Sequence, residues 1–270
     1  MAKQPSLVPP PGKKVHLKDY DPAYSGDYKN ELEARDLIEK DLLHLRELQD
    51  ALYAERKHPL LVVLQGIDAG GKDGTINHVF RGLNPQGVVV TSFKQPTEEE
   101  SAHDFLWRIH QHTPAKGYIA VFNRSHYEEV LVVRVHDLVP KKVWKARYDQ
   151  INQFEEILAA NGTTILKFFL YISRDEQKKR FEERLHDPDK RWKFGLGDLE
   201  ERKLWDDYQA AYEDMLSKCN TDDAPWTIVP ANHKWYRNLV VTRTIVETLE
   251  KLDPKYPDPI ENIDKIVIPD

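Results

Sequence analysis

One segment limits this chain more than any other: a short apolar run that leads directly into a glycine-rich loop. The run is LLVVLQ, from Leu60 to Gln65, and the loop that follows reads GIDAGGKDG. A continuous apolar run with β-branched residues predicts a strand that is buried on both faces. Gly66, Gly71 and Lys72 have the Gly-x-x-x-x-Gly-Lys spacing of loops that bind phosphate. The pair of features predicts an α/β domain with an anion site at the end of this strand.

The chemistry of such a loop explains its residues. Glycines let backbone N–H groups curl around an anion, the following helix presents its positive N-terminus, and Lys72 adds a mobile charge. The alternative is a glycine-rich turn with an incidental lysine. The residues that we assign to phosphate binding here are Gly66, Ala69, Gly70, Gly71, Lys72, Asp73 and Gly74.

Two acidic residues set this loop apart. In an ordinary loop a Ser or Thr follows the lysine and ligates magnesium, whereas Asp73 follows Lys72 here. Asp68 also lies within the loop, where an acid would repel phosphate unless it holds a cation. Since Mg²⁺ prefers one or two carboxylates plus phosphate oxygens, we expect Asp68 to bind metal or to orient the acceptor. The alternative is that Asp68 only caps the next helix.

Strand-like and helix-like stretches alternate along the chain. The expected strands are 60–65, 87–93, 118–122, 164–172 and 226–229, and the expected helices are 30–56, 74–83, 97–112, 140–160, 174–185, 199–216 and 234–252. Such alternation predicts a parallel sheet flanked by helices. We expect an extended proline-rich arm over 1–26, one domain over 27–252 and a C-terminal tail over 253–270.

Composition excludes several classes of protein. The chain is 40% hydrophobic and 31% charged, with a mean hydropathy of −0.65, so neither a disordered chain nor a membrane protein is expected. The net charge of −6 argues against general binding to nucleic acid or membranes. The single cysteine and the lack of a signal peptide predict a cytoplasmic protein.

Polar residues follow the strand expected at 118–122, and ligands of open α/β sheets lie beyond the carboxyl ends of strands. Asn123 occupies the place of the usual second magnesium acid, so that role passes to water, Asp68 or Glu128. Arg124 is positioned to clamp a transferring phosphoryl group. Alternatively, Arg124 and Glu128 form an ion pair at a helix start.

A basic segment follows the fourth expected strand. Between Lys178 and Lys193 there are seven basic and four acidic residues, a local charge of +3 in an acidic chain. Arg180 and Arg184 lie one helical turn apart and can grip one anion. We expect residues 178–198, including Lys193, to form a lid over a polyanionic substrate; the alternative is a solvated helix face. Trp192 either stacks on a base or packs on Trp205.

Three segments together resemble the second family of polyphosphate kinases: GIDAGGKDGT, FNRSHYEEVLVVRVH and DKRWKFGLGDLEERKLWDDY. The resemblance covers roughly residues 27–252. It implies a phosphate-loop kinase fold of the thymidylate-kinase type with a helical lid, Mg²⁺, and assembly as a homodimer or homotetramer. The implied reaction is reversible phosphoryl transfer between inorganic polyphosphate and a nucleotide.

The second segment is similar to the subgroup that phosphorylates both AMP and ADP, giving ADP and ATP. Glu129 stands where that subgroup often carries Asp, so its role stays open. By the resemblance, Asp68 serves metal binding and positioning of the acceptor, Lys72 and Arg124 hold the transferring phosphate, and Arg180 and Arg184 lie on the lid side. We assign Glu128 as a second metal ligand on the grounds given above. Arg134 is implied to line a polyphosphate channel.

No covalent intermediate is needed for this reaction, because a nucleotide phosphate can attack in line while fixed positive charges stabilise the transition state. An ionised phosphate acceptor also needs no general base. Two other hypotheses remain open from the residues: an ATP-dependent phosphate-loop kinase of a nucleotide or other small acceptor, and a non-catalytic phosphate-loop protein that binds nucleotide as a switch.

Overall fold

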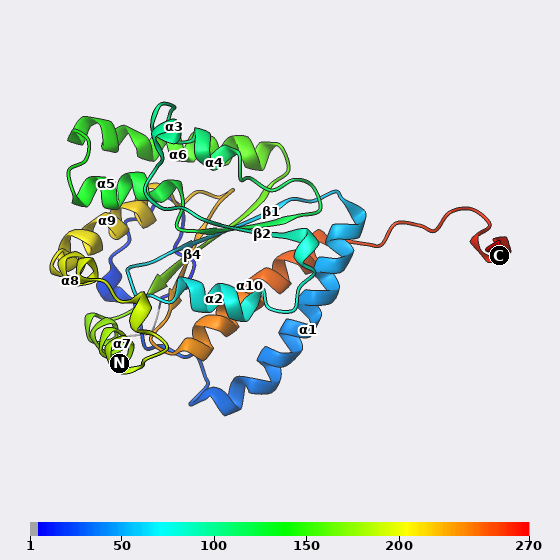
Figure 1. The fold of residues 1–270 in the computed structure, drawn as a ribbon, viewed down its shortest axis with the longest axis horizontal. Helices are drawn as coiled ribbons and strands as arrows, with labels where there is room; N and C mark the ends of the chain where they lie inside the picture. Colours follow the sequence, from blue (N-terminus) through cyan, green and yellow to red (C-terminus); the bar gives the residue numbers. More distant parts are fainter. Residues whose placement is uncertain (1–4, 270) are drawn as a thin grey trace.

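The sheet at the centre of the molecule is parallel throughout and has the strand order β2-β3-β1-β4-β5 (Figure 1). The structure is a computed structural model that describes residues 5–269. The strands within this range are β1 (Leu60–Gln65), β2 (Val88–Ser92), β3 (Ile119–Asn123), β4 (Thr164–Tyr171) and β5 (Trp226–Pro230). All five expected strands are confirmed, with ends that differ by one residue at most. The predicted α/β fold class is therefore confirmed.

Helices cover both faces of this sheet. The helices are α1 (Glu31–Glu55), α2 (Lys72–Val79), α3 (Glu98–Ser101), α4 (Trp107–His110), α5 (Val132–Val135), α6 (Lys141–Ala160), α7 (Arg174–His186), α8 (Leu196–Lys203), α9 (Trp205–Lys218) and α10 (Lys234–Leu252). Short 3-10 turns are η1 (Leu17–Asp19), η2 (Pro85–Gly87), η3 (His126–Val130), η4 (Arg191–Lys193) and η5 (Ile263–Lys265). In Figure 1, α1, α2 and α10 lie below the sheet and α3, α4 and α6 above it, while α7 and α8 lie at one end.

Hydrophobic periodicity explains the long helices. Every residue of β1 is buried, and the predicted apolar face of α6 is buried as well. The chain turns out of α6 through Gly162, whose φ of +88° is a left-handed conformation that glycine adopts without strain. On α1, Ala34 and Ile38 pack against Tyr236 and Leu239 of α10, so these two helices lie side by side (Figure 1).

Two expected helices are wrong as single elements. The capping box of Thr97 and Glu100 forms, but α3 ends at Ser101 and a new turn starts after Asp104, whose carboxylate accepts a hydrogen bond from the N–H of Leu106. The helix expected over 199–216 is divided at Leu204 into α8 and α9. The helix expected over 74–83 begins earlier, at Lys72, because the glycine-rich loop leads straight into its first turn.

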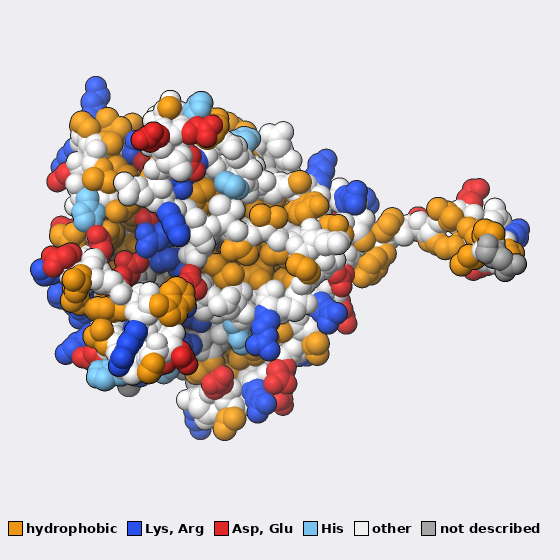
Figure 2. All heavy atoms as spheres, viewed as in Figure 1, with side chains coloured by type: hydrophobic (Ala, Val, Ile, Leu, Met, Phe, Trp, Pro, Cys, Tyr) orange, Lys and Arg blue, Asp and Glu red, His pale blue; other side chains and the backbone are white. Residues whose placement is uncertain are grey.

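The N-terminal arm packs along β5 and α9. Leu17 is buried, its N–H donates to Glu213, and the N–H of Ile228 donates to the carbonyl of Leu7. Residues 1–4 of the expected arm lie outside the described residues. Beyond α10 the chain extends away from the body and carries exposed apolar side chains such as Val267 and Ile268 (Figures 1 and 2). Over residues 5–269, no helix is long and apolar enough to cross a membrane.

Candidate active site

The polar segments that the sequence singles out come together beyond the carboxyl ends of the strands. Strand β1 pairs with β3 on one side and with β4 on the other, so the direction of the chain through the sheet changes at β1. Open α/β sheets bind ligands at such a point. The loop after β1 and the turn after β3 meet here, and α7 and α10 approach from the other side.

The loop after β1 is shaped by close contacts with its neighbours. A Cβ atom on Gly66 would lie 2.8 Å from the carbonyl oxygen of Leu170, so only glycine fits there. Gly71 caps α2 in a left-handed conformation with φ +107°. The Lys72 Nζ donates to the carbonyl of Gly66 at 2.5 Å, and the Thr75 hydroxyl donates to that of Gly71. Burial, and then the charge of Arg124, lowers the pKa of Lys72.

Arg180 lies beneath this loop. Its guanidinium is buried and donates to the carbonyls of Ala69 at 2.9 Å and Gly70 at 3.0 Å, and also to Glu176 and to the backbone after β5. The sequence predicts that Arg180 and Arg184 grip one anion from a lid. In the structure, Arg180 instead donates its N–H groups to Glu176 and to backbone carbonyls of the protein. Arg184 instead lies 3.9 Å from Asp198 of α8.

Arg124 joins the two strand ends. Its backbone is left-handed, with φ +63°, and its N–H donates to the carbonyl of Leu64. The guanidinium lies 2.8 Å from Asp68 and 3.7 Å from Glu128, so the ion pair considered as an alternative exists at the same place as the expected phosphate clamp. Burial disfavours the charge of Arg124, but Glu128 and Asp68 outweigh burial and raise its pKa.

The carboxylates near the loop suit a metal that also binds substrate. In the part of the chain that the structure describes, no cluster of three His, Cys, Asp or Glu side chains could hold a metal alone. Asp68 and Asp73 nevertheless line one cavity, and Asp73 is oriented by the amide of Asn123 at 2.7 Å. Because Mg²⁺ takes one or two carboxylates plus phosphate oxygens, this donor set fits it. Glu128 lines the neighbouring cavity.

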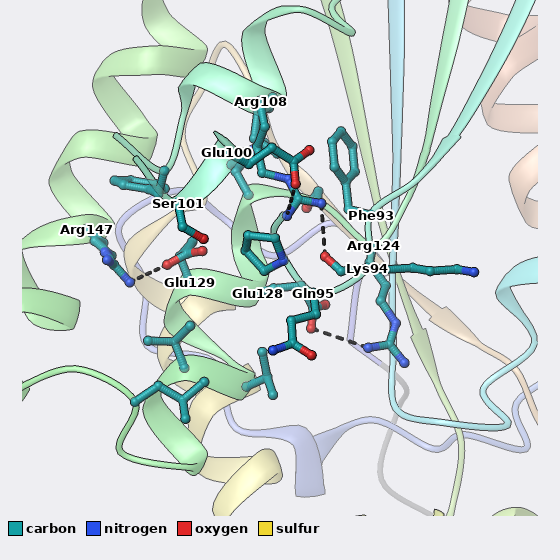
Figure 3. Close-up of a pocket in the computed structure, with 18 of the residues that line it drawn as sticks. Phe93, Lys94, Gln95, Glu100, Ser101, Arg108, Arg124, Glu128, Glu129 and Arg147 are labelled. Atoms are coloured by element: carbon teal, nitrogen blue, oxygen red, sulfur yellow. Dashed lines mark hydrogen bonds and ion pairs between the residues drawn. The ribbon is translucent and has the colours of Figure 1, made fainter. Parts of the chain in front are cut away.

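Two cavities of different character meet at this site. The first has a volume of about 690 Å³, and twelve of the twenty residues in its wall are polar or charged. Most of its lining surface is nevertheless apolar, so we call it the apolar cavity. Three ion pairs lie in its wall: Glu100 with Arg108 at 3.2 Å, Glu129 with Arg147, and the pair of Arg124 with Glu128 (Figure 3). Glu129 thus has a definite partner on α6, and burial raises its pKa although Arg147 opposes the rise.

The second cavity, of about 900 Å³, has nine basic and four acidic residues in its wall, and we call it the basic cavity. Its basic residues are Lys72, Lys94, Arg124, Arg180, Arg184, Lys190, Lys193, Lys234 and Arg237. Lys and Arg side chains gather in the middle of the left half of the molecule, above the region of α7 and α8 (Figure 2). The described residues that line both cavities are Phe93, Lys94, Gln95 and Arg124. Figure 3 shows Arg124 at this junction, turned toward Glu128.

Some predicted residues lie elsewhere. Arg134 donates to the Tyr148 hydroxyl and to Asp214, and among the described residues it is not in the wall of either cavity. Trp192 is 77% exposed at the basic cavity, whereas Trp205 is 8% exposed in the core, so they do not pack on each other.

Sequence reasoning missed a buried polar network under η3. Lys167 of β4 is 1% exposed and donates to Glu155 at 2.6 Å, to the hydroxyl of Tyr127 at 2.7 Å and to the carbonyl of Cys219. Glu155 also contacts His126 at 3.1 Å. A lysine inside an otherwise apolar strand was the available signal, because a buried ammonium needs acceptors. No comparable pattern in the sequence marked Arg108 and Arg147 as residues of the site.

Comparisons with known proteins agree on one family. The sequence profile of Polyphosphate kinase 2 (PPK2) matches residues 27–257. The chain is 55% identical over 262 residues to the AMP/ADP-polyphosphate phosphotransferase of Meiothermus ruber, covering 96% of this chain and 97% of that one. It is 46% identical over 259 residues to the ADP-polyphosphate phosphotransferase of Rhodopseudomonas palustris, covering 92% and 90%.

A solved structure gives the same result. The crystal structure of Polyphosphate Kinase 2 from Arthrobacter aurescens TC1 superimposes with a TM-score of 0.92 at 41% sequence identity. The match covers 97% of this chain and 95% of that chain. The likeness therefore extends over the whole sheet and over the loops that form both cavities.

Proposed function

Because this chain belongs to the polyphosphate kinase 2 family, we propose that it transfers phosphoryl groups from inorganic polyphosphate to AMP and ADP, giving ADP and ATP. Its fold is that of the phosphate-loop kinases. The observation that carries the proposal is the meeting of an apolar and a basic cavity at Arg124. The relatives that act on polyphosphate make the ATP-dependent alternative the less favoured one.

Each substrate has a cavity of matching chemistry. Polyphosphate carries a charge on every phosphate and no apolar surface, so it suits the basic cavity, where lysines and arginines outnumber acids. A nucleoside has an aromatic base, and the apolar cavity offers Phe93, Phe105 and Ile109. This arrangement brings the terminal phosphate of the donor and the phosphate of the acceptor together at Arg124.

The chain's own groups then position and stabilise the transferring phosphoryl group. Arg124 and the loop N–H groups surround it, and Lys72 turns from the Gly66 carbonyl to a phosphate oxygen. When substrate binds, Arg124 exchanges one of its carboxylate partners for phosphate oxygens. The acceptor phosphate is already ionised, so no side chain has to remove a proton.

Mg²⁺ is part of the proposal. Asp68 would hold it from the loop, Asp73 would support it beside Asn123, and Glu128 would reach it from the apolar cavity. When bound, the metal supplies positive charge that neutralises the phosphate oxygens.

We also propose that the part of the segment 178–198 that follows α7 closes over the donor, with Lys193 and Trp192 at its rim, while Arg180 stays fixed beneath the loop. The exposed apolar residues of the C-terminal tail support self-association as a homodimer or homotetramer. The proposed location is the cytoplasm, on the grounds of cysteine content given above.

The test is an assay of ATP formed from ADP and long-chain polyphosphate, with no other nucleoside triphosphate present. We expect ATP in the presence of Mg²⁺, none with excess chelator, and recovery when Mg²⁺ is restored. Formation of ADP from ATP plus AMP without polyphosphate, together with no ATP from polyphosphate, would instead support an ATP-dependent kinase.

A further inference from the structure

A second arginine lies against the phosphate-binding loop, on the side of α10. Arg237 stands in the first turn of that helix, and its side chain is only 3% exposed. Its Nη1 would lie 2.1 Å from a Cβ atom on Gly71, so the missing side chain at Gly71 makes room for the guanidinium. Gly74 is also close, with its Cβ position 3.4 Å from Nη2. The Arg237 guanidinium therefore lies against the first turn of α2, where the helix dipole is positive.

This arginine has little to neutralise it. Nε and Nη2 both donate to the side-chain oxygen of Asn238, at 3.1 and 2.8 Å, while Nη1 donates no hydrogen bond to any group within residues 5–269. No carboxylate within that range forms an ion pair with Arg237. By contrast, Arg180 uses its donors on Glu176 and on backbone carbonyls.

The surroundings of Arg237 disfavour its charge. Burial, and then the charge of Arg180, lowers its pKa to about 10. A buried cation beside another cation and a helix N-terminus is unfavourable unless an anion is added. Arg237 lines the basic cavity and not the apolar one, so an anion that enters the basic cavity meets it.

We propose that Arg237 binds phosphate oxygens of the polyphosphate donor beside Gly71, with Nη1 as the donor that the folded protein leaves free. The inference rests on the proposed function for the identity of the donor. It adds a binding residue on α10 to those on the loop and to Arg124, which follows β3. Its chemistry is that of a guanidinium fork on phosphate, which forms strong charge-assisted hydrogen bonds.

The experiment compares Arg237→Met with Lys251→Met, an exposed position on the same helix. Melting temperatures are measured with and without tripolyphosphate, and KM values are measured for polyphosphate and for ADP. We expect Arg237→Met to melt no lower than wild type without ligand, because an unpaired buried charge is gone. Its stabilisation by tripolyphosphate should fall by more than about half, and its KM for polyphosphate should rise on the order of tenfold while KM for ADP stays within about twofold.

Other outcomes overturn the inference. A lower melting temperature with undiminished stabilisation by tripolyphosphate would mean that Arg237 only braces the loop. A rise in KM for ADP alone would mean that Arg237 binds a phosphate of the nucleotide and not of polyphosphate. A wild-type protein without polyphosphate-dependent activity would defeat the proposed function instead, and the tripolyphosphate shift would still report whether Arg237 binds the anion. Lys251→Met should behave as wild type in every measurement.

Discussion

Replacement of Arg124 by lysine should reduce the rate of ATP formation from ADP and polyphosphate on the order of a thousandfold, the scale found for arginines that stabilise phosphoryl transfer. Lysine keeps the positive charge, and in the left-handed backbone conformation of this position, with φ +63°, it has the same conformational strain as arginine. It lacks the planar fork that reaches both Asp68 and Glu128. The loss should therefore lie in transition-state stabilisation and not in folding.

The measurement is the initial rate at several concentrations of each substrate, so that kcat and KM are obtained separately. We expect kcat to fall far more than either KM rises. Arg35→Lys is the matched control, since Arg35 is an exposed residue of α1 whose ion-pair partner among the described residues is Glu39. A kcat for Arg124→Lys within about tenfold of wild type would contradict the placing of phosphoryl transfer at the junction of the cavities.

Replacement of Lys167 by methionine should destabilise the protein by about 3–5 kcal/mol, which is the cost of leaving one partner of a buried ion pair alone. Lys167 and Glu155 are both about 1% exposed. In the native protein, burial raises the pKa of Glu155, but Lys167 and His126 outweigh it and hold that pKa below its usual range. Without Lys167, the Glu155 carboxylate stays buried with His126 and the Tyr127 hydroxyl.

Denaturant unfolding of wild type, Lys167→Met and Lys167→Met/Glu155→Gln measures this effect. The double variant removes both charges and should recover a large part of the lost stability. In the single variant, burial raises the pKa of Glu155 above its unfolded value, so the folded state binds more protons and the deficit should grow as pH rises from 5 to 8. A single variant within about 1 kcal/mol of wild type would show that the network contributes little.

This network explains how the fold supports the site. Tyr127 and His126 belong to η3, which also carries Glu128 and Glu129. Lys167 and Glu155 fix η3 against β4 and α6, so the side chains that line the apolar cavity stand on a rigid base. Loss of Lys167 should therefore also lower activity.

Local patterns explain what could be predicted from the sequence. The apolar run of β1 and the glycine spacing after it are short-range features, and so is the helical face of α6; all three are found in the structure. The break near Asp104 was not predicted, because a side-chain cap competes there with a continuing helical pattern.

The site was predicted only where a motif marked it. Asp68, Lys72 and Arg124 meet as expected. The position of Arg180 under the loop depends on contacts between residues more than a hundred positions apart, and the approach of Arg237 to Gly71 depends on how α10 packs. Neither is encoded in a local pattern. The two cavities likewise arise from the packing of several elements.

The measurement that tests the central claim most directly is phosphorus NMR of the purified protein with AMP, Mg²⁺ and long-chain polyphosphate, without added ATP. We predict that the polyphosphate signal declines while the phosphate signals of ADP and then the β-phosphate signal of ATP appear. Unchanged AMP and polyphosphate signals, from protein shown to be folded and to bind tripolyphosphate, would contradict the claim that this chain phosphorylates AMP and ADP from polyphosphate.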